Sequence, residues 1–347
     1  MSESDVTRGG LRGVRPGRDA VPGAQDAGRS RRARRRRGRG EQPVVPEARF
    51  SSYYGRPILN KPTWQALDIA GYLFLGGLAG ASSLLAAGGQ ATGRPGLARV
   101  AKLGAAGAIS GSLGALVHDL GRPARFLNML RVFKPTSPMS IGSWLLAGYA
   151  PLTMAAAAAD VTGRGRVAGA GATAAAACLG PAVATYTAVL LSDTAVPSWH
   201  EGYRELPFVF AGSASSAAAG LALACAPAGQ TAPARRMAVL GAGLELGAFQ
   251  LMKRRMGLAA EPFEQGGPYR LLRAAELLTA GGAALAAYTG TGTGRRRGRA
   301  CAVTAGVALL TGSAALRFGV FHAGVDSAED PRYTVVPQRE RLRARPG

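Results

Sequence analysis

The stretch Gly171–Gly180, GATAAAACLG, consists almost entirely of small residues and shows no polar stripe. The earlier stretch Met154–Asp160, MAAAAAD, shows none either. A helix on the surface of a soluble protein carries polar residues along one face. A helix in a bilayer needs no such face, and small residues let neighbouring backbones approach closely. These stretches therefore predict helices that cross a membrane.

Eight segments of the chain are long and apolar enough to cross a bilayer, which takes about 20 mostly apolar residues. They lie at roughly 65–88, 98–118, 140–160, 166–191, 206–226, 236–252, 271–289 and 300–321. Short charged connections separate them. The predicted fold class is therefore all-α: a polytopic membrane protein with a bundle of eight transmembrane helices.

The two ends of the chain differ from this apolar middle. The chain has 347 residues, with 42 Lys and Arg against 20 Asp and Glu and a formal net charge of +22. Its mean hydropathy is only +0.08, because polar, Arg-rich ends dilute the average. We predict a disordered Arg-rich cytoplasmic tail at 1–50, an eight-helix membrane domain at 51–324 and a basic C-terminal tail at 325–347.

The basic run Arg31–Arg39 could bind nucleic acid or fix the orientation of the chain in the membrane. We favour the second interpretation, since Lys and Arg collect on the cytoplasmic side of membrane proteins and attract anionic lipid. No nucleic-acid partner is expected. Eight crossings put both ends on one side, and both ends are basic. We therefore predict a multi-pass protein of the cell (plasma) membrane with both termini in the cytoplasm.

The alternation of crossing directions brings polar residues from distant segments to one edge of the bundle. The start of the first crossing, the end of the second, the start of the third and the end of the fourth must lie on the same side. The residues that can meet there are Asn60, Lys61, His118, Asp119, Arg122, Trp144, Tyr186, Asp193 and His200.

His118 and Asp119 end the second crossing. They could be structural, because a helix C-terminus favours a His and Asp119 could bind a neighbouring arginine. In the functional interpretation His118 hydrogen-bonds a quinone oxygen and passes its proton, while Asp119 orients the ring. Tyr186, near the same edge, is a second candidate donor, although it could serve packing alone.

The loop after Asp119 alternates basic and apolar residues. Its basic residues are Arg122, Arg125, Arg131 and Lys134, and they flank Phe126 and Met129. The loop could simply be solvated on the positive side of the membrane. Apolar residues between charges favour a surface that docks a partner, so we predict a partner-docking role for the four basic residues.

Two carboxylates, Glu245 and Glu276, lie within predicted crossings. An ionisable group at membrane depth is costly and indicates function. The pair is interpreted as a proton path, with ordinary ion pairing as the alternative. Haem needs axial ligands, usually His, on facing helices. All three histidines lie near segment ends, so neither haem nor a metal is expected in this chain.

Several motifs together resemble the NrfD/polysulfide-reductase family of membrane subunits. They are PILNKPTW at 57–64, YLFLGGLAGAS at 72–82, HDLGRPARFLNMLRVFKPTSPMSIGSW at 118–144, YTAVLLSDTAVPSWHE at 186–201 and GLELGAFQ at 243–250. The resemblance runs from about Tyr53 to Arg332. It implies a haem-free, eight-helix subunit that binds menaquinone or ubiquinone and anchors an iron–sulfur ferredoxin-like subunit. A molybdopterin oxidoreductase catalytic subunit is the further partner that the resemblance implies.

The resemblance also implies which residues bind quinone. Asn60 at the start of the first crossing and Tyr186 on the fourth match family positions, and we add Trp144 from the same edge. His118 and Asp119 stand in for a histidine that some relatives carry early in the first crossing. The expected function is electron exchange between the quinone pool and the ferredoxin-like subunit. The alternatives are a structural membrane anchor and a proton-translocating module without quinone chemistry of its own.

Overall fold

The computed structural model describes residues 6–7, 10–11, 58–59, 62, 64–121, 124–289 and 295–343. The chain divides into two compact units. One, here called the tail unit, joins Met1–Pro62 to Ser327–Gly347. The other, here called the bundle unit, is Thr63–Asp326. The bundle unit contains nearly all the predicted site residues.

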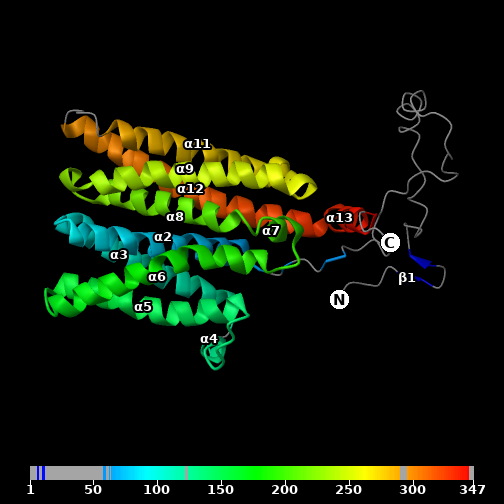
Figure 1. Ribbon diagram of the computed structural model, residues 1–347, viewed down its shortest axis with the longest axis horizontal. Coiled ribbons are helices and arrows are strands. Elements are labelled where there is room, and N and C mark those ends of the chain that lie inside the picture. The colour runs from blue at the N-terminus through cyan, green and yellow to red at the C-terminus, as the bar shows by residue number, and fades with distance from the viewer. Residues whose placement is uncertain are drawn as a thin grey trace. The chain divides into compact units, whose positions relative to one another are not determined.

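Four long helices form what we call the first half of the bundle unit (Figure 1). They are α2 (Ala66–Ala91), α3 (Pro95–Asp119), α5 (Pro138–Thr162) and α6 (Arg166–Ser192), with the short α4 (Ala124–Met129) between α3 and α5. Pro95 and Pro138 each begin a helix, where a missing N–H costs nothing. Gly163 and Gly165 have positive φ and make the tight turn between α5 and α6.

The second half of the bundle unit follows in sequence (Figure 1). Its elements are α7 (Pro197–Glu201), α8 (Leu206–Cys225), η2 (Ala228–Gln230), α9 (Ala232–Met256), η3 (Gly257–Ala260), α10 (Glu261–Glu264), α11 (Gly266–Tyr288) and α12 (Arg295–Glu329). Helix α8 packs on α2 and α6 and so joins the two halves.

The described part of the tail unit contains three elements. Strands β1 (Val6–Thr7) and β2 (Gly10–Leu11) pair antiparallel, and α13 runs over Arg332–Arg343. Most of the predicted Arg-rich tail at 1–50 lies outside the described residues. Its predicted disorder, like the predicted domain boundaries, stays a prediction.

All eight predicted crossings fall in long helices of the described chain, so the helical membrane fold is confirmed, while the count of eight crossings stays a prediction. Six of these described helices, α2, α3, α5, α6, α8 and α12, are long and apolar enough to cross a membrane. Helices α9 and α11 do not meet that standard, because charges interrupt their apolar runs. The interrupting charges are Arg235, Arg236, Glu245, Lys253, Arg254 and Arg255 in α9, and Arg270, Arg273 and Glu276 in α11.

Glycines set the closest helix contacts in both halves. A Cβ on Gly80 of α2 would collide with the carbonyl oxygen of Gly180 in α6. In the second half a Cβ on Gly306 of α12 would collide with the carbonyl oxygen of Gly220 in α8. Close backbone approach at small residues is how helices associate in lipid. The predicted role of the small residues in packing is thereby confirmed at these positions.

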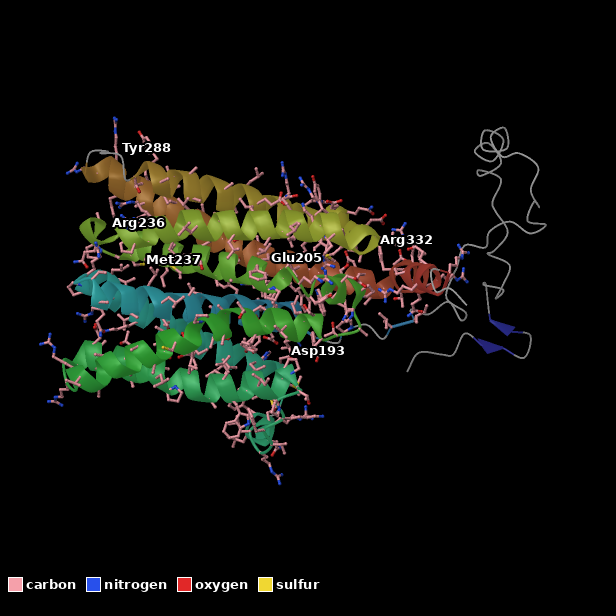
Figure 2. All side chains as sticks on the ribbon, viewed as in Figure 1. Asp193, Glu205, Arg236, Met237, Tyr288 and Arg332 are labelled. Atoms are coloured by element: carbon pink, nitrogen blue, oxygen red, sulfur yellow. The ribbon has the colours of Figure 1, made fainter. Side chains whose placement is uncertain are left out.

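Successive long helices alternate in direction, which gives the bundle unit two ends. We call the end that holds the start of α2 and the ends of α3 and α6 the rim, and the opposite end the distal end. Figure 2 shows Asp193 and Glu205 at the rim and Arg236 and Tyr288 at the distal end. The predicted convergence of chain ends at one edge follows from this alternation.

Candidate functional site

A His–Asp pair stands at the rim between the end of α3 and the first turn of α2. The His118 Nδ1 atom lies 2.8 Å from Asp68 Oδ2. The His118 side chain is 72% exposed, whereas that of Asp68 is only 11% exposed. Because the carboxylate engages Nδ1, the other ring nitrogen is directed to the surroundings. The prediction that Asp119 orients this ring is wrong: the orienting carboxylate is Asp68, from a different helix.

Two tyrosines lie one helical turn deeper. Asp68 and Tyr72 are four residues apart in α2 and therefore lie on the same face. The Tyr72 ring meets that of Tyr186 edge-on, with centroids 6.4 Å apart. Tyr186 is buried, and its hydroxyl has no hydrogen-bond partner among the described residues. A buried hydroxyl without a partner is costly, which singles out Tyr186 as the candidate hydrogen-bond donor of this cluster.

The other two predicted quinone-binding residues do not join this cluster. Asn60 lies outside the described residues. Trp144 is 44% exposed, and its ring meets Phe133 edge-on with centroids 6.1 Å apart. Gly142, two residues earlier in α5, is the residue that touches the Tyr186 ring. Positions two apart in a helix face opposite ways, so Trp144 points away from Tyr186.

The loop between α3 and α5 presents both charge and apolar surface. Arg125, Arg131 and Lys134 are exposed, and Arg122 lies outside the described residues. The exposed apolar side chains are Leu127, Val132 and Phe133, at 66%, 67% and 61%. The sequence suggested Phe126 and Met129 as the apolar side chains of this surface, but both are only half-exposed.

Ser140 fixes the shape of this loop. Its hydroxyl donates to the Val132 carbonyl at 3.0 Å and accepts from the Lys134 N–H at 3.0 Å. The Arg125 guanidinium donates to the Leu120 carbonyl at 2.9 Å, which ties α4 to the end of α3. The loop therefore holds its charged and apolar side chains in a defined arrangement.

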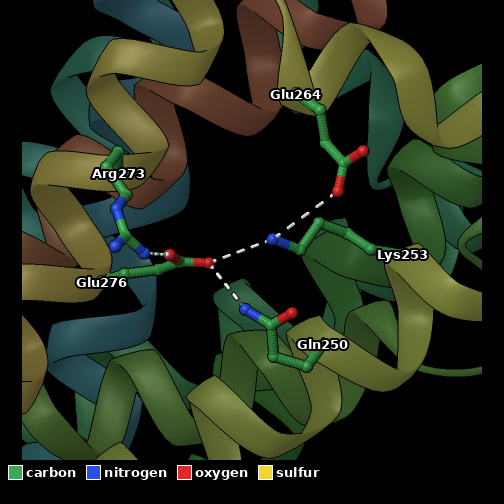
Figure 3. Close-up of polar contacts among 5 residues, drawn as sticks. All are labelled: Gln250, Lys253, Glu264, Arg273 and Glu276. Atoms are coloured by element: carbon green, nitrogen blue, oxygen red, sulfur yellow. Dashed lines mark hydrogen bonds and ion pairs between the residues drawn. The ribbon is translucent and has the colours of Figure 1, made fainter.

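Glu276 is tied into an ion network between α9 and α11 (Figure 3). Its Oε1 accepts from Lys253 Nζ at 3.2 Å and from Gln250 Nε2 at 3.0 Å, and its Oε2 accepts from Arg273 at 2.9 Å. Lys253 also reaches Glu264 at 4.0 Å. The Glu276 side chain is 12% exposed and its charge is fully compensated. The alternative of ordinary ion pairing therefore describes Glu276.

Glu245 has a different environment, in the middle of the second half. It is 1% exposed, and its Oε1 accepts from the Thr279 hydroxyl at 3.0 Å. Its Oε2 has no hydrogen-bond partner among the described residues. A buried carboxylate with one unsatisfied oxygen is suited to exchange a proton or hold water.

Arg317 of α12 is a second buried charge in the same half, and the sequence analysis missed it. It is 0% exposed, its Nη2 donates to the Phe210 carbonyl at 2.9 Å, and its guanidinium lies 3.5 Å from the Phe210 ring centroid. Its Nε and Nη1 have no partner among the described residues. An arginine within an apolar run of the predicted eighth crossing was the signal that could have revealed it.

Two further ion pairs were also missed. At the distal end, Lys102 of α3 binds Asp160 of α5 at 3.1 Å, with side chains 9% and 20% exposed. At the rim, Arg255 binds Glu205 through two contacts, of 2.6 Å and 2.7 Å. The hydrogen-bonded Arg255 guanidinium lowers the pKa of Glu205, which lies just before α8.

The fold and these polar clusters define the class of this chain: it is a multi-pass helical membrane protein. Residues 57–326 match the family model described as "Polysulphide reductase, NrfD", so the chain belongs to that family and the resemblance is confirmed. Proteins of this family are membrane subunits of redox complexes. No match is found among curated proteins.

Proposed function

We propose that this chain is the membrane-anchor and quinone-binding subunit of an iron–sulfur/molybdopterin oxidoreductase complex. It exchanges electrons between the quinone pool, menaquinone or ubiquinone, and a ferredoxin-like subunit. One observation carries the proposal: a His118–Asp68 pair stands at the rim, and Tyr72, one turn along α2 from Asp68, packs against Tyr186, whose buried hydroxyl has no partner among the described residues. These are a proton-exchanging group and a hydrogen-bond donor, which a quinone carbonyl requires.

Each of these residues has a defined task in this proposal. The quinone supplies the redox chemistry, and the protein supplies binding and protons. With Nδ1–H donating to Asp68, the other ring nitrogen of His118 is free to accept a proton, and the carboxylate stabilises the resulting imidazolium. The Tyr186 hydroxyl donates a hydrogen bond to a carbonyl oxygen. Asn60 remains a proposed third contact.

The loop between α3 and α5 is proposed to dock the iron–sulfur subunit. Exposed Arg125, Arg131 and Lys134 surround exposed Leu127 and Phe133. Apolar anchors within a charged surround are typical of a protein interface, and the charges attract an acidic partner. The loop begins after Asp119, the neighbour of His118, so a partner bound there lies next to the proposed quinone site.

The proposal includes eight crossings of the cell membrane with both termini in the cytoplasm. Helices α9 and α11 can join the six apolar spans because their main carboxylate, Glu276, is neutralised by Lys253 and Arg273. Reporter fusions at each end test the orientation. A reporter that is active only in the cytoplasm should work at both termini.

A second candidate function, proton translocation, is favoured by the buried Glu245. Its unsatisfied Oε2 lies on α9, and Thr279, which binds its other oxygen, is one turn from Glu276 on α11. In this candidate function the proton passes between the Glu276 network and Glu245. Glu245→Gln in proteoliposomes tests this, because loss of proton movement with electron transfer intact would support it.

The main proposal is tested with His118→Ala in the intact, assembled complex. General acid–base catalysis contributes about 100-fold or more, so quinone-dependent turnover should fall by at least about 100-fold. Asp119→Asn is the matched control, since Asp119 does not hold the ring, and it should retain turnover. Full activity of an assembled His118→Ala complex would leave this chain as a structural anchor.

A further inference from the structure

A groove of about 650 Å³ opens at the distal end, between the end of α2 and the start of α9. Figure 2 shows two of its lining residues, Arg236 and Met237, near this end. The groove lies at the opposite end of the bundle unit from His118. Neither the quinone proposal nor the proton path uses it.

The charge that lines the groove is entirely basic. Arg94 from the connection before α3 and Arg236 from the first turns of α9 both contribute to it. All its lining residues are among those that the structure describes, and none of them is acidic. The hydrogen bond described for the Arg94 guanidinium is a long one, 3.3 Å, to the Thr92 carbonyl. By contrast, Lys102 nearby is fully engaged with Asp160.

The rest of the groove is apolar and runs along the helix axis. Arg236, Leu240 and Leu244 are spaced four residues apart in α9, so they form one stripe with the charge at its outer end. Leu240 is 74% exposed and Leu244 is 42% exposed. On a membrane protein such side chains face lipid. The stripe therefore changes from cationic to apolar as it enters the bilayer.

We infer that this groove binds an anionic phospholipid, with the phosphate between Arg94 and Arg236 and an acyl chain along Leu240 and Leu244. Arginine guanidinium groups bind phosphate through charge-assisted hydrogen bonds. A free phosphate would gain nothing from the apolar stripe, and a neutral quinone would leave two guanidinium groups uncompensated. The volume also lies within the range of about 300–1,000 Å³ found for ligand sites.

The first test measures lipid binding to the full-length protein in detergent by native mass spectrometry. Wild type should bind phosphatidylglycerol more tightly than phosphatidylcholine. Each basic residue contributes about 1 kcal/mol to anionic lipid binding, so Arg94→Gln and Arg236→Gln should each weaken binding about fivefold. The double variant should lose about 25-fold. Arg164→Gln, an exposed arginine at the same end outside the groove, should bind like wild type.

A second variant blocks the groove without changing its charge. A Cβ on Gly88 would meet nothing within 4 Å, so Gly88→Leu places a side chain in the groove with little strain on the fold. It should lower phosphatidylglycerol binding to the level of the double arginine variant. Gly107→Leu is the matched control, because Gly107 is also an exposed helical glycine with open space around it.

Four results would overturn the inference. They are unchanged binding in the double arginine variant, equal binding of the two lipids, unchanged binding in Gly88→Leu, and full displacement of the lipid by an equal concentration of inorganic phosphate. Each removes one of the features on which the site depends: its charge, its selectivity, its location or its apolar stripe.

Discussion

The two halves of the bundle unit contain the same number of long helices in the described chain but place their charges differently. The first half has its two ion pairs near its ends, His118–Asp68 at the rim and Lys102–Asp160 at the distal end. The second half buries Glu245 and Arg317 in its middle, each with unsatisfied polar atoms. A paired charge near water costs little, whereas an unsatisfied one at depth is kept for a function. The first half therefore holds a candidate site that is accessible from the surface, at His118, and the second half holds an internal one, at Glu245 and Arg317.

The largest expected effect concerns the close helix contacts at glycine, which both halves contain. Gly80→Leu in the first half and Gly306→Leu in the second should each abolish folded protein, since the new side chain would collide with backbone. The measurement is the monodisperse yield in mild detergent.

Exposed glycines with open space provide the controls for this test, Gly107→Leu in the first half and Gly281→Leu in the second. Both should be produced like wild type. If only one half is sensitive to its glycine substitution, the two halves are not assembled by the same kind of contact.

The next prediction compares the Lys102–Asp160 ion pair of the first half with the buried charges of the second half. Lys102→Met leaves Asp160 with only the long contact to Arg99 and should cost about 2–3 kcal/mol of unfolding free energy. The double variant Arg317→Met with Glu245→Gln removes both buried charges of the second half, which act on each other, and should change stability by less than about 1 kcal/mol. Unfolding in increasing denaturant in a fixed detergent measures both.

The double variant Lys102→Met with Asp160→Leu is the control, because it removes both charges of the pair. It should recover most of the stability that Lys102→Met loses. A larger loss for the Arg317→Met, Glu245→Gln double variant than for Lys102→Met would reverse the comparison between the halves.

Asp68→Asn should lower quinone-dependent turnover about tenfold, as expected when a histidine loses its orienting partner. Asp68→Glu should restore most of the activity, which a purely structural role would not predict. The readout is turnover at saturating quinone in the assembled complex. Glu245→Gln in the second half should leave this electron transfer unchanged. A tenfold loss of turnover in Glu245→Gln as well would show that Glu245 and the His118 cluster act as one site.

The smallest effect concerns the rim of the second half, where Arg255 holds Glu205. Because the pKa of Glu205 is lowered in the folded protein, the pair stabilises above the ordinary glutamate pKa of about 4.3. That contribution is lost as the pH falls through the lowered value. Glu205→Gln should therefore be less stable than wild type at pH ~7, and this difference should shrink at an acid pH below about 4.3.

Thermal unfolding at the two pH values measures this difference. Glu264→Gln, which removes an exposed partner 4.0 Å from Lys253, should behave like wild type at both. If the difference in stability between Glu205→Gln and wild type instead increased in acid, the result would contradict a lowered pKa of Glu205 in the folded protein.

Much of the site could be predicted from particular residues, and the rest depended on distant partners. His118 and Tyr186 were found because the alternation of crossings places their helix ends together, whatever the details of packing. Asp68 was missed because a single carboxylate in the first turn of a helix looks like a favourable helix start. Only the packing of α2 against α3 shows that it faces His118. Trp144 was misjudged because the face it occupies on α5 depends on which side meets α6.

The sequence by itself determined the class of this protein, its all-helical fold and the end of the bundle at which the His118 cluster lies. These follow from segment length, apolar composition and the parity of crossings, none of which requires knowledge of which helices touch. The tertiary structure alone decided which charges are paired. It placed Asp68 beside His118, enclosed Glu276 in a network, and left Glu245 and Arg317 unsatisfied. The physical reason is that an ion pair needs atoms within a few ångströms, and in this fold those atoms come from helices far apart in the sequence.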